Sequence, residues 1–136
     1  MAELKQIPPA FIDRAWADGA HQLSKACEAS GGEITADQLK MMLSRGERTL
    51  LAVMNDGKPV GWLVIHLDQL PNVRALHVCE LYAPGATFSE CRDQLWEYAR
   101  QNGCSEIRCS APPVQARWNR MRWGFEPIYT TLRVKL

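Results

Sequence analysis

Along the chain, the spacing of the hydrophobic positions alternates between the period of a helix and the period of a strand. Near the N-terminus, apolar residues recur every three or four positions until Gly31-Gly32 ends the pattern. In the middle, two β-rich runs are joined by Asn55-Asp56-Gly57-Lys58, a strong hairpin signal. The pattern predicts nine elements, in this order: helices over residues 12–27 and 36–45, strands over 49–54, 60–67 and 74–83, a helix over 87–101, a strand over 106–110, a helix over 114–123 and a strand over 128–136.

This order of elements indicates an α/β chain with a mixed sheet. A hairpin comes first, and strands then alternate with helices, which predicts helices on both faces of the sheet. With 136 residues, of which 46% are hydrophobic, the chain can bury one core. We therefore expect a single domain over residues 1–136.

The strand over residues 74–83 is expected to lie in the centre of the sheet, because both of its faces are mostly apolar. Strict alternation places Glu80 on the same face as Val78. A carboxylate in such a strand has two readings. It is either a general base facing a cleft, with its pKa raised by burial, or one half of an ion pair with an arginine.

The turn after this strand leads directly into the helix over residues 87–101. Thr87 and Glu90 have the spacing of a capping box, which would engage the free N–H groups of the first turn. Glu90 and Asp93 also bring negative charge to an end of the helix that attracts anions. On these residues alone, a capped helix that binds no phosphate is the favoured interpretation.

The net charge argues against a dedicated nucleic-acid binder, and the cysteine pattern argues against a structural zinc site. The net charge is +1, but from Arg108 onward six basic residues face one acidic residue. Five cysteines without Cys-x-x-Cys spacing predict reduced cysteines and a cytoplasmic location. No run of residues is apolar enough to span a membrane, and no His/Cys spacing predicts a metal site.

The order of elements resembles the GNAT (N-acetyltransferase) superfamily over nearly the whole chain. The resemblance is carried by the hairpin LLAVMNDGKPVGWLVIHL with Gly61 in its second strand, by the strand end ELYA, and by RWNRMRWGFEPI. It implies a GNAT-like, mostly antiparallel central sheet and the transfer of an acetyl group from acetyl-CoA to a small-molecule or protein amine. Glu80 would be the base. The residues that would contact the coenzyme are Leu81, Tyr82, Ala83, Gly85, Thr87, Phe88 and Ser89.

Two positions depart from the family pattern. The family's turn carries Arg/Gln-x-x-Gly-x-Gly/Ala, whereas this turn is about one residue short and has Gly85 as its one glycine. The family's proton-donating tyrosine, four residues before Gly-Phe, is replaced by Arg120. Arginine stabilises a thiolate but is a poor proton donor. Tyr82 and Tyr129 are the candidate substitutes.

Two other functions therefore stay open. The chain could be a catalytically inactive GNAT-fold protein that acts through protein contacts, as small virus-encoded or accessory members do. It could also be a nucleic-acid-associated module that uses Arg117, Arg120 and Arg122, although a solvated helix face is the favoured interpretation of these arginines. On that helix, Val114, Trp118 and Met121 are expected to face the core. For His66, His77 and Cys79, core packing is a better interpretation than a Cys/His nucleophile.

Overall fold

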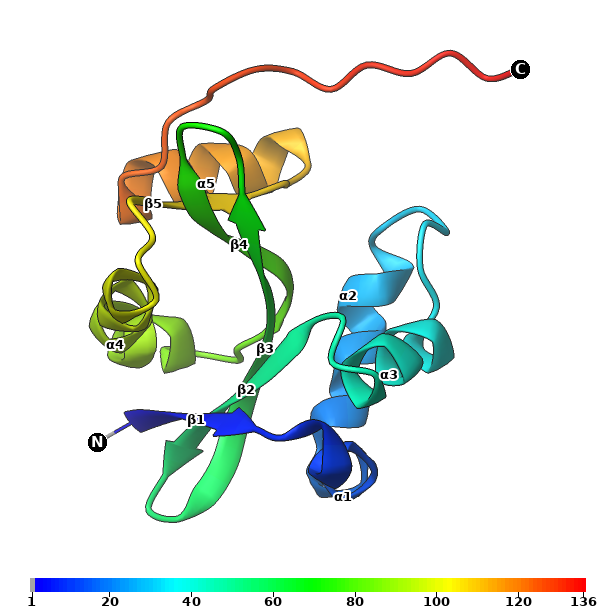
Figure 1. Cartoon of the computed structure of the whole chain (residues 1–136), viewed down its shortest axis with the longest axis vertical. Coiled ribbons are helices and arrows are strands. Elements are labelled where there is room, and N and C mark those ends of the chain that lie inside the picture. The colour runs from blue at the N-terminus through cyan, green and yellow to red at the C-terminus, as the bar shows by residue number, and fades with distance from the viewer. Residues whose placement is uncertain (1) are drawn as a thin grey trace.

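The structure, a computed structural model, describes residues 2–136. The fold is a twisted sheet with helices on both of its faces (Figure 1). The α-helices and strands are, in chain order, β1 (Ala2–Ile7), α1 (Ile12–Asp18), α2 (Ser24–Glu28), α3 (Ala36–Ser44), β2 (Thr49–Asn55), β3 (Lys58–Gln69), β4 (Arg74–Tyr82), α4 (Thr87–Gln101), β5 (Glu106–Cys109) and α5 (Pro113–Trp123). Short 3-10 turns at Pro9–Phe11 and Ala20–Leu23 precede α1 and α2.

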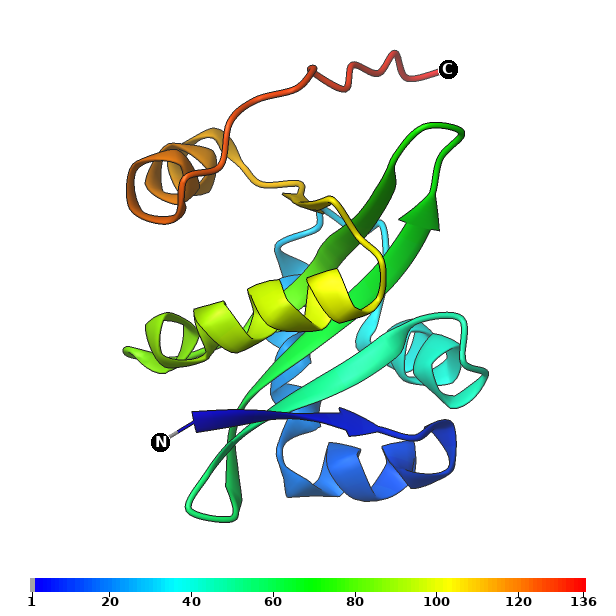
Figure 2. The ribbon, with the colours of Figure 1, turned by 60° about the vertical axis from the view of Figure 1, so that its left-hand side comes forward.

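The sheet order is β1-β2-β3-β4-β5. The first four strands pair antiparallel and β5 pairs parallel to β4, so the sheet is mixed and mostly antiparallel, as predicted. Helices α1, α2 and α3 cover one face, and α4 covers the other (Figures 1 and 2). Each face has its own hydrophobic cluster, which fits the two-sided apolar pattern of the middle strands.

Local sequence signals account for several element boundaries. Asp56 and Gly57, both with positive φ, form the predicted tight turn between β2 and β3. Thr35 and Gln38 form the predicted capping box of α3, with both reciprocal hydrogen bonds present. Strand β4 lies between β3 and β5, which confirms the expected central position.

The structure differs from the prediction in three places. The N-terminal residues, for which no element is predicted, form edge strand β1, in which Glu3, Lys5 and Gln6 are exposed. The single helix predicted over residues 12–27 is interrupted at Gly19, whose φ of 135° is incompatible with a continuous helix. The strand predicted over residues 128–136 is absent, since this segment has no strand partner within residues 2–136.

Helix α5 also differs from its prediction. Val114, Trp118 and Met121 are exposed instead of facing the core, and none of the residues Pro113–Trp123 is buried. Aromatic contacts at the end of the helix connect it to the rest of the molecule: the Trp123 ring lies 4.9 Å from the Phe88 ring of α4. A hydrogen bond from Asn119 Nδ2 to Cys109 Sγ at 3.5 Å connects the middle of the helix to β5, and the apolar stripe of the helix is left in solvent.

Candidate active site

The turn between β4 and α4 is the candidate cofactor site, and its structure corrects the predicted capping box. Helix α4 has Ala86 as its N-cap residue and no side-chain cap. Thr87 is the first helical residue, so its hydroxyl is not in the capping position. That hydroxyl instead donates a hydrogen bond to the Pro84 carbonyl oxygen at 2.6 Å. The predicted pairing of Thr87 with Glu90 is therefore wrong.

This arrangement leaves backbone donors available at the start of α4. The Thr87 N–H is directed to the Pro84 carbonyl, and the Glu90 N–H to the Ala86 carbonyl. Between them, the N–H groups of Phe88 and Ser89 have no hydrogen-bond acceptor among residues 2–136. Free N–H groups in a first helical turn carry partial positive charge and bind anions. The two N–H groups that the predicted capping box would have used, those of Thr87 and Glu90, are thus bonded to backbone carbonyls, and the two between them are free.

Glycines shape this turn on both sides. Gly85 adopts a left-handed conformation, with φ of 62°, and the space beside it is open. Gly61 in β3 lies beneath the turn. A Cβ atom at that position would be 2.9 Å from the Thr87 methyl carbon and 3.0 Å from the Tyr82 carbonyl oxygen. Gly61 therefore permits the close approach that buries Thr87.

Two arginines lie against the ring of Trp123, the last residue of α5. The guanidinium carbon of Arg92 lies 5.6 Å from the centre of the Trp123 ring, and that of Arg122 lies 5.4 Å from it. The Trp123 ring in turn packs against the ring of Phe88 in the first turn of α4. The sequence placed Arg122 in a patch with Arg117 and Arg120, and it did not predict the contacts of Trp123 with Phe88 and Arg92 of α4, which join residues more than 30 positions apart.

Negative charge near the turn opposes anion binding. Glu90 is exposed in the first turn of α4, as its sequence position implied. Asp93 is paired with Arg92 at 3.3 Å, which offsets part of that arginine's charge. The pair is exposed to solvent, so its effect is screened by salt.

Glu80 lies in β4, two residues before the strand ends at Tyr82, and a β-bulge sets its direction. Val64 pairs with Glu80 but Ile65 pairs with Val78, so the bulge inserts Cys79 as an extra residue. Beyond it, Tyr82 packs on the α1–α3 side, whereas Val78 packs on the α4 side. The predicted alternation, which put Glu80 on the face of Val78, is wrong at this point.

The Glu80 carboxylate is buried and paired. Arg48 donates from Nη1 to both carboxylate oxygens, at 2.9 and 3.2 Å. Burial raises the pKa of Glu80 above its usual value, and the Arg48 charge opposes that rise. Of the two readings of this residue, the structure contains the ion pair.

The remaining candidates for nucleophilic chemistry are poorly suited to it. Burial raises the pKa of the Cys79 thiol to about 11, so the thiol stays protonated at neutral pH. Burial lowers the pKa of His77, and His66 is paired with Asp68. The interpretation of these residues as packing groups agrees with this arrangement.

The other predicted site residues lie in three different places. Leu81 is exposed, whereas Tyr82 and Ala83 are half-buried at the end of β4. Arg117 and Arg120 are exposed on α5, beside a shallow hollow that Glu126 also lines. Of the two candidate proton donors, Tyr129 lies in the exposed segment after α5, and Tyr82 faces α2 with the Lys25 ammonium 5.3 Å from its ring centre.

Within residues 2–136, no three His, Cys, Asp or Glu side chains are grouped as a metal site requires. The five cysteines all lie in this described part and are unpaired. No helix among the described residues is long and apolar enough to cross a membrane.

Solved structures with a similar fold include acetyltransferases. One is a ribosomal-protein-alanine N-acetyltransferase from Brucella melitensis, 14% identical, with a TM-score of 0.68 and 100% of both chains covered. A probable acetyltransferase is 14% identical, with a TM-score of 0.70 over 98% of this chain and 96% of that one. A third is AAC(6')-Iy in complex with the bisubstrate analogue CoA-S-monomethyl-acetylneamine, 12% identical, with a TM-score of 0.68 over 100% of this chain and 98% of that one.

No family model and no curated protein sequence matches the chain. The structural similarity nevertheless spans 98% or more of the chain, and these solved structures have the GNAT fold. The chain therefore has the GNAT fold, as the order of its elements predicted. At these identities the similarity defines the fold, and chemistry has to be argued from the site.

Proposed function

We propose that this protein is an acetyl-CoA-dependent acyltransferase that acts on an amine. The proposal rests on one observation: the N–H groups of Phe88 and Ser89 are free at the start of α4, where the Phe88 ring packs on Trp123, the ring that Arg92 and Arg122 both approach. This combination of backbone donors and cations suits the pyrophosphate of coenzyme A. A similar fold binds a coenzyme A bisubstrate analogue, which supports the same choice of ligand.

The residues present fit the coenzyme in the following way. The free amides would hold the pyrophosphate, and the open space beside Gly85 would let it approach the backbone. Arg92 and Arg122 would offset the charge of Glu90. Bound acetyl-CoA would supply an activated acetyl group as a thioester. The end of β4 and the turn would line the rest of the coenzyme through Leu81, Tyr82, Ala83 and Thr87.

Glu80 is the proposed general base for the acceptor amine. Its buried position keeps its pKa raised, which brings a carboxylate closer to the value that suits proton transfer at neutral pH. Arg48 occupies the carboxylate in the structure, so an acceptor ammonium has to take its place. Arg120 would stabilise negative charge without donating a proton.

The same ion pair favours a second candidate function, a GNAT-fold protein that no longer catalyses acetyl transfer and acts through protein contacts. If Arg48 never leaves Glu80, no base is available to the amine. The two functions differ in one respect that can be measured: the first requires coenzyme binding and turnover, and the second requires neither.

The first experiment is a titration of the protein with acetyl-CoA, followed by calorimetry and by heat denaturation. We expect micromolar affinity and, at a hundredfold excess over Kd, a stabilisation of about 2.7 kcal/mol. Binding with turnover of an amine panel would support the acyltransferase. Absence of binding at millimolar acetyl-CoA would overturn it and favour the non-catalytic protein.

The role of Glu80 is tested with Glu80→Gln, which keeps the size of the side chain. Loss of a general base lowers turnover by about 100-fold or more. Glu47→Gln, an exposed change beside Arg48, is the control and should retain full turnover. Equal turnover of Glu80→Gln and wild type, with both folded by circular dichroism, would show that another group deprotonates the amine.

A further inference from the structure

The ion pair between Arg48 and Glu80 uses only part of the hydrogen-bonding capacity of the arginine. Both hydrogen bonds to the Glu80 carboxylate come from one nitrogen, Nη1, at 2.9 and 3.2 Å. The other two guanidinium nitrogens, Nε and Nη2, have no acceptor among residues 2–136. A guanidinium is a planar fork of N–H donors, and its Nε–Nη2 edge matches the two oxygens of a carboxylate. The free edge of Arg48 is therefore suited to one more anionic group.

This free edge is in contact with solvent. The side chain of Arg48 is 25% exposed, whereas that of Glu80 is 9% exposed. In the part of the chain that the structure describes, no side-chain nitrogen or oxygen is both buried and without a hydrogen-bond partner. Because Nε and Nη2 have no partner, they are not buried, and a small molecule in solution can contact them.

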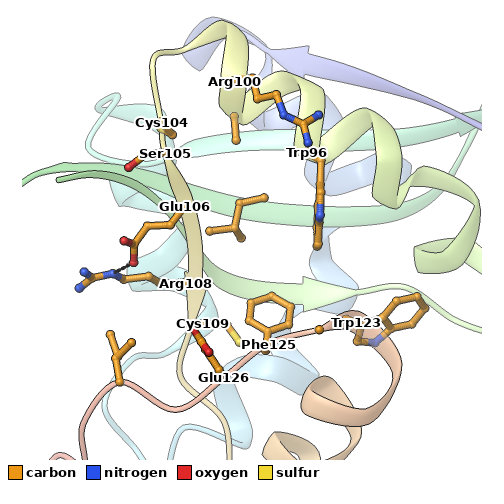
Figure 3. A pocket seen from close by; sticks show the side chains of 14 residues that line it. Trp96, Arg100, Cys104, Ser105, Glu106, Arg108, Cys109, Trp123, Phe125 and Glu126 are labelled. Atoms are coloured by element: carbon orange, nitrogen blue, oxygen red, sulfur yellow. Dashed lines mark hydrogen bonds and ion pairs between the residues drawn. The ribbon is translucent and has the colours of Figure 1, made fainter.

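The groups beside this pair are neutral or already paired. Burial raises the pKa of the Cys27 and Cys79 thiols, which lie close enough to interact with both charges, so the thiols stay protonated at neutral pH. On β5, Arg108 lines a separate cavity and donates from Nε to the Glu106 carboxylate at 2.7 Å (Figure 3). None of these groups can replace a lost partner of Glu80.

The pair therefore restricts which amine can use Glu80 as a base. An acceptor ammonium that binds the Glu80 carboxylate takes the place of Nη1, so a simple amine leaves the Arg48 guanidinium without an anion. Removing one partner of a buried ion pair is costly because the other charge stays unpaired. An acceptor that carries its own carboxylate avoids this cost, since that carboxylate binds the guanidinium. Both protein charges are then paired in the complex.

We propose that the acceptor is a zwitterion, a free α-amino acid whose ammonium binds Glu80 and whose carboxylate binds the Nε–Nη2 edge of Arg48. This inference rests on the proposed acyltransferase function and narrows it to one substrate class. Because the carboxylate and the guanidinium of the protein are in direct contact, the two charges of the ligand also have to be close together. In an α-amino acid a single carbon separates them.

The same pair accounts for release of the product. Acetylation converts the ammonium into a neutral amide, which no longer pairs with the Glu80 carboxylate. Once the proton taken up by Glu80 has passed to water, Nη1 of Arg48 binds the carboxylate again, as in the structure. The ion pair is thus the resting state of the site between two acceptors.

The wild type tests this proposal with acceptors that differ in one group. In the presence of acetyl-CoA, turnover is measured for a panel of L-α-amino acids and for the amide of each, in which a neutral carboxamide replaces the carboxylate. We expect kcat/KM to be about 100-fold higher for the acids, although the amides have the less basic amines. Equal or higher kcat/KM for the amides, or for amines without a carboxylate, would overturn the zwitterion and leave the acyltransferase standing. Turnover of no amine at all would overturn both.

A variant of Arg48 tests the contact itself. Arg48→Lys keeps a positive charge beside Glu80 but lacks the planar fork, so the ratio of acid to amide kcat/KM should fall by about tenfold or more, mainly through a higher KM for the acid. Arg45→Lys makes the same change at an exposed arginine of the same loop and should keep the ratio of the wild type. An unchanged ratio in a folded Arg48→Lys protein would show that the carboxylate binds elsewhere, and would overturn the proposal.

Discussion

Helices α3 and α4 begin with the same sequence signal but have different N-termini. Each has a threonine followed three residues later by a residue that can complete a capping box. At α3, Thr35 and Gln38 exchange both hydrogen bonds. At α4, Thr87 is one position too far into the helix, and its hydroxyl is turned back to Pro84.

The difference comes from what precedes each helix. The chain enters α3 in an extended conformation at Thr35, which directs the hydroxyl toward the first turn. The chain enters α4 through a tight turn at Gly85 that is packed on Gly61, and Thr87 is buried by that contact. A capping motif therefore predicts a cap only where the preceding backbone is extended. At α4, the result is a helix end with free amides.

The largest effect is expected from filling the space that Gly61 leaves for the turn. Gly61→Ala should lower the free energy of unfolding by about 1–3 kcal/mol, because its Cβ would overlap the Thr87 methyl group. Urea denaturation measures the change. In a Thr87→Ser background, which lacks that methyl group, the same substitution should cost less. An equal cost in both backgrounds would show that the Thr87 contact does not position the turn.

Removing the cap of α3 should have an intermediate effect. Thr35→Ala deletes the hydroxyl that accepts the Gln38 N–H and should cost about 1 kcal/mol of stability. Thr35→Ser, which keeps a hydroxyl, serves as the control and should be close to wild type. Denaturation midpoints that are equal for Ala and Ser would contradict the role of this cap.

The smallest effect on stability is expected at the corresponding position of α4. Because Glu90 takes no part in a capping box, Glu90→Ala should change the free energy of unfolding by no more than about 0.5 kcal/mol. The substitution should instead tighten coenzyme A binding, more at low salt than at high salt, since it deletes a repulsion. Glu97→Ala, farther along α4, is the control and should leave affinity unchanged. A stability loss of the size expected for Thr35→Ala would show that Glu90 does take part in a capping box at α4.

Much of the fold follows from local patterns. The alternation of apolar and polar residues predicts the central strand and the two covered faces of the sheet, and the Asp56-Gly57 turn predicts the hairpin. Both signals depend on residues that are close together in the sequence. Edge strand β1 and the break at Gly19 were not found, because an edge strand tolerates polar side chains and one glycine does not always end a helix. The segment over residues 128–136 has the pattern of a strand, but a strand also needs a partner.

Less of the candidate site than of the fold could be predicted from the sequence. Glu80 was identified as a misfit, but its partner Arg48 lies 32 residues away and the bulge at Cys79 changes its direction. The contact between α5 and α4 depends on the packing of Trp123 against Phe88, which no local motif encodes. Long-range contacts of this kind determine the charge around the turn.

The most direct test of the central claim is the coenzyme A affinity of Ser89→Pro compared with that of Ser89→Ala. Proline removes an N–H group that the helix does not use and is tolerated in a first turn, whereas alanine keeps the N–H and removes only the exposed hydroxyl. If this amide binds the pyrophosphate, Ser89→Pro should raise the Kd at least tenfold by calorimetry, in line with about 1.5–3 kcal/mol for a hydrogen bond to a charged group. Ser89→Ala should bind like wild type. Equal affinity of the two variants, with both folded by circular dichroism, would contradict the assignment of the α4 amides to the coenzyme.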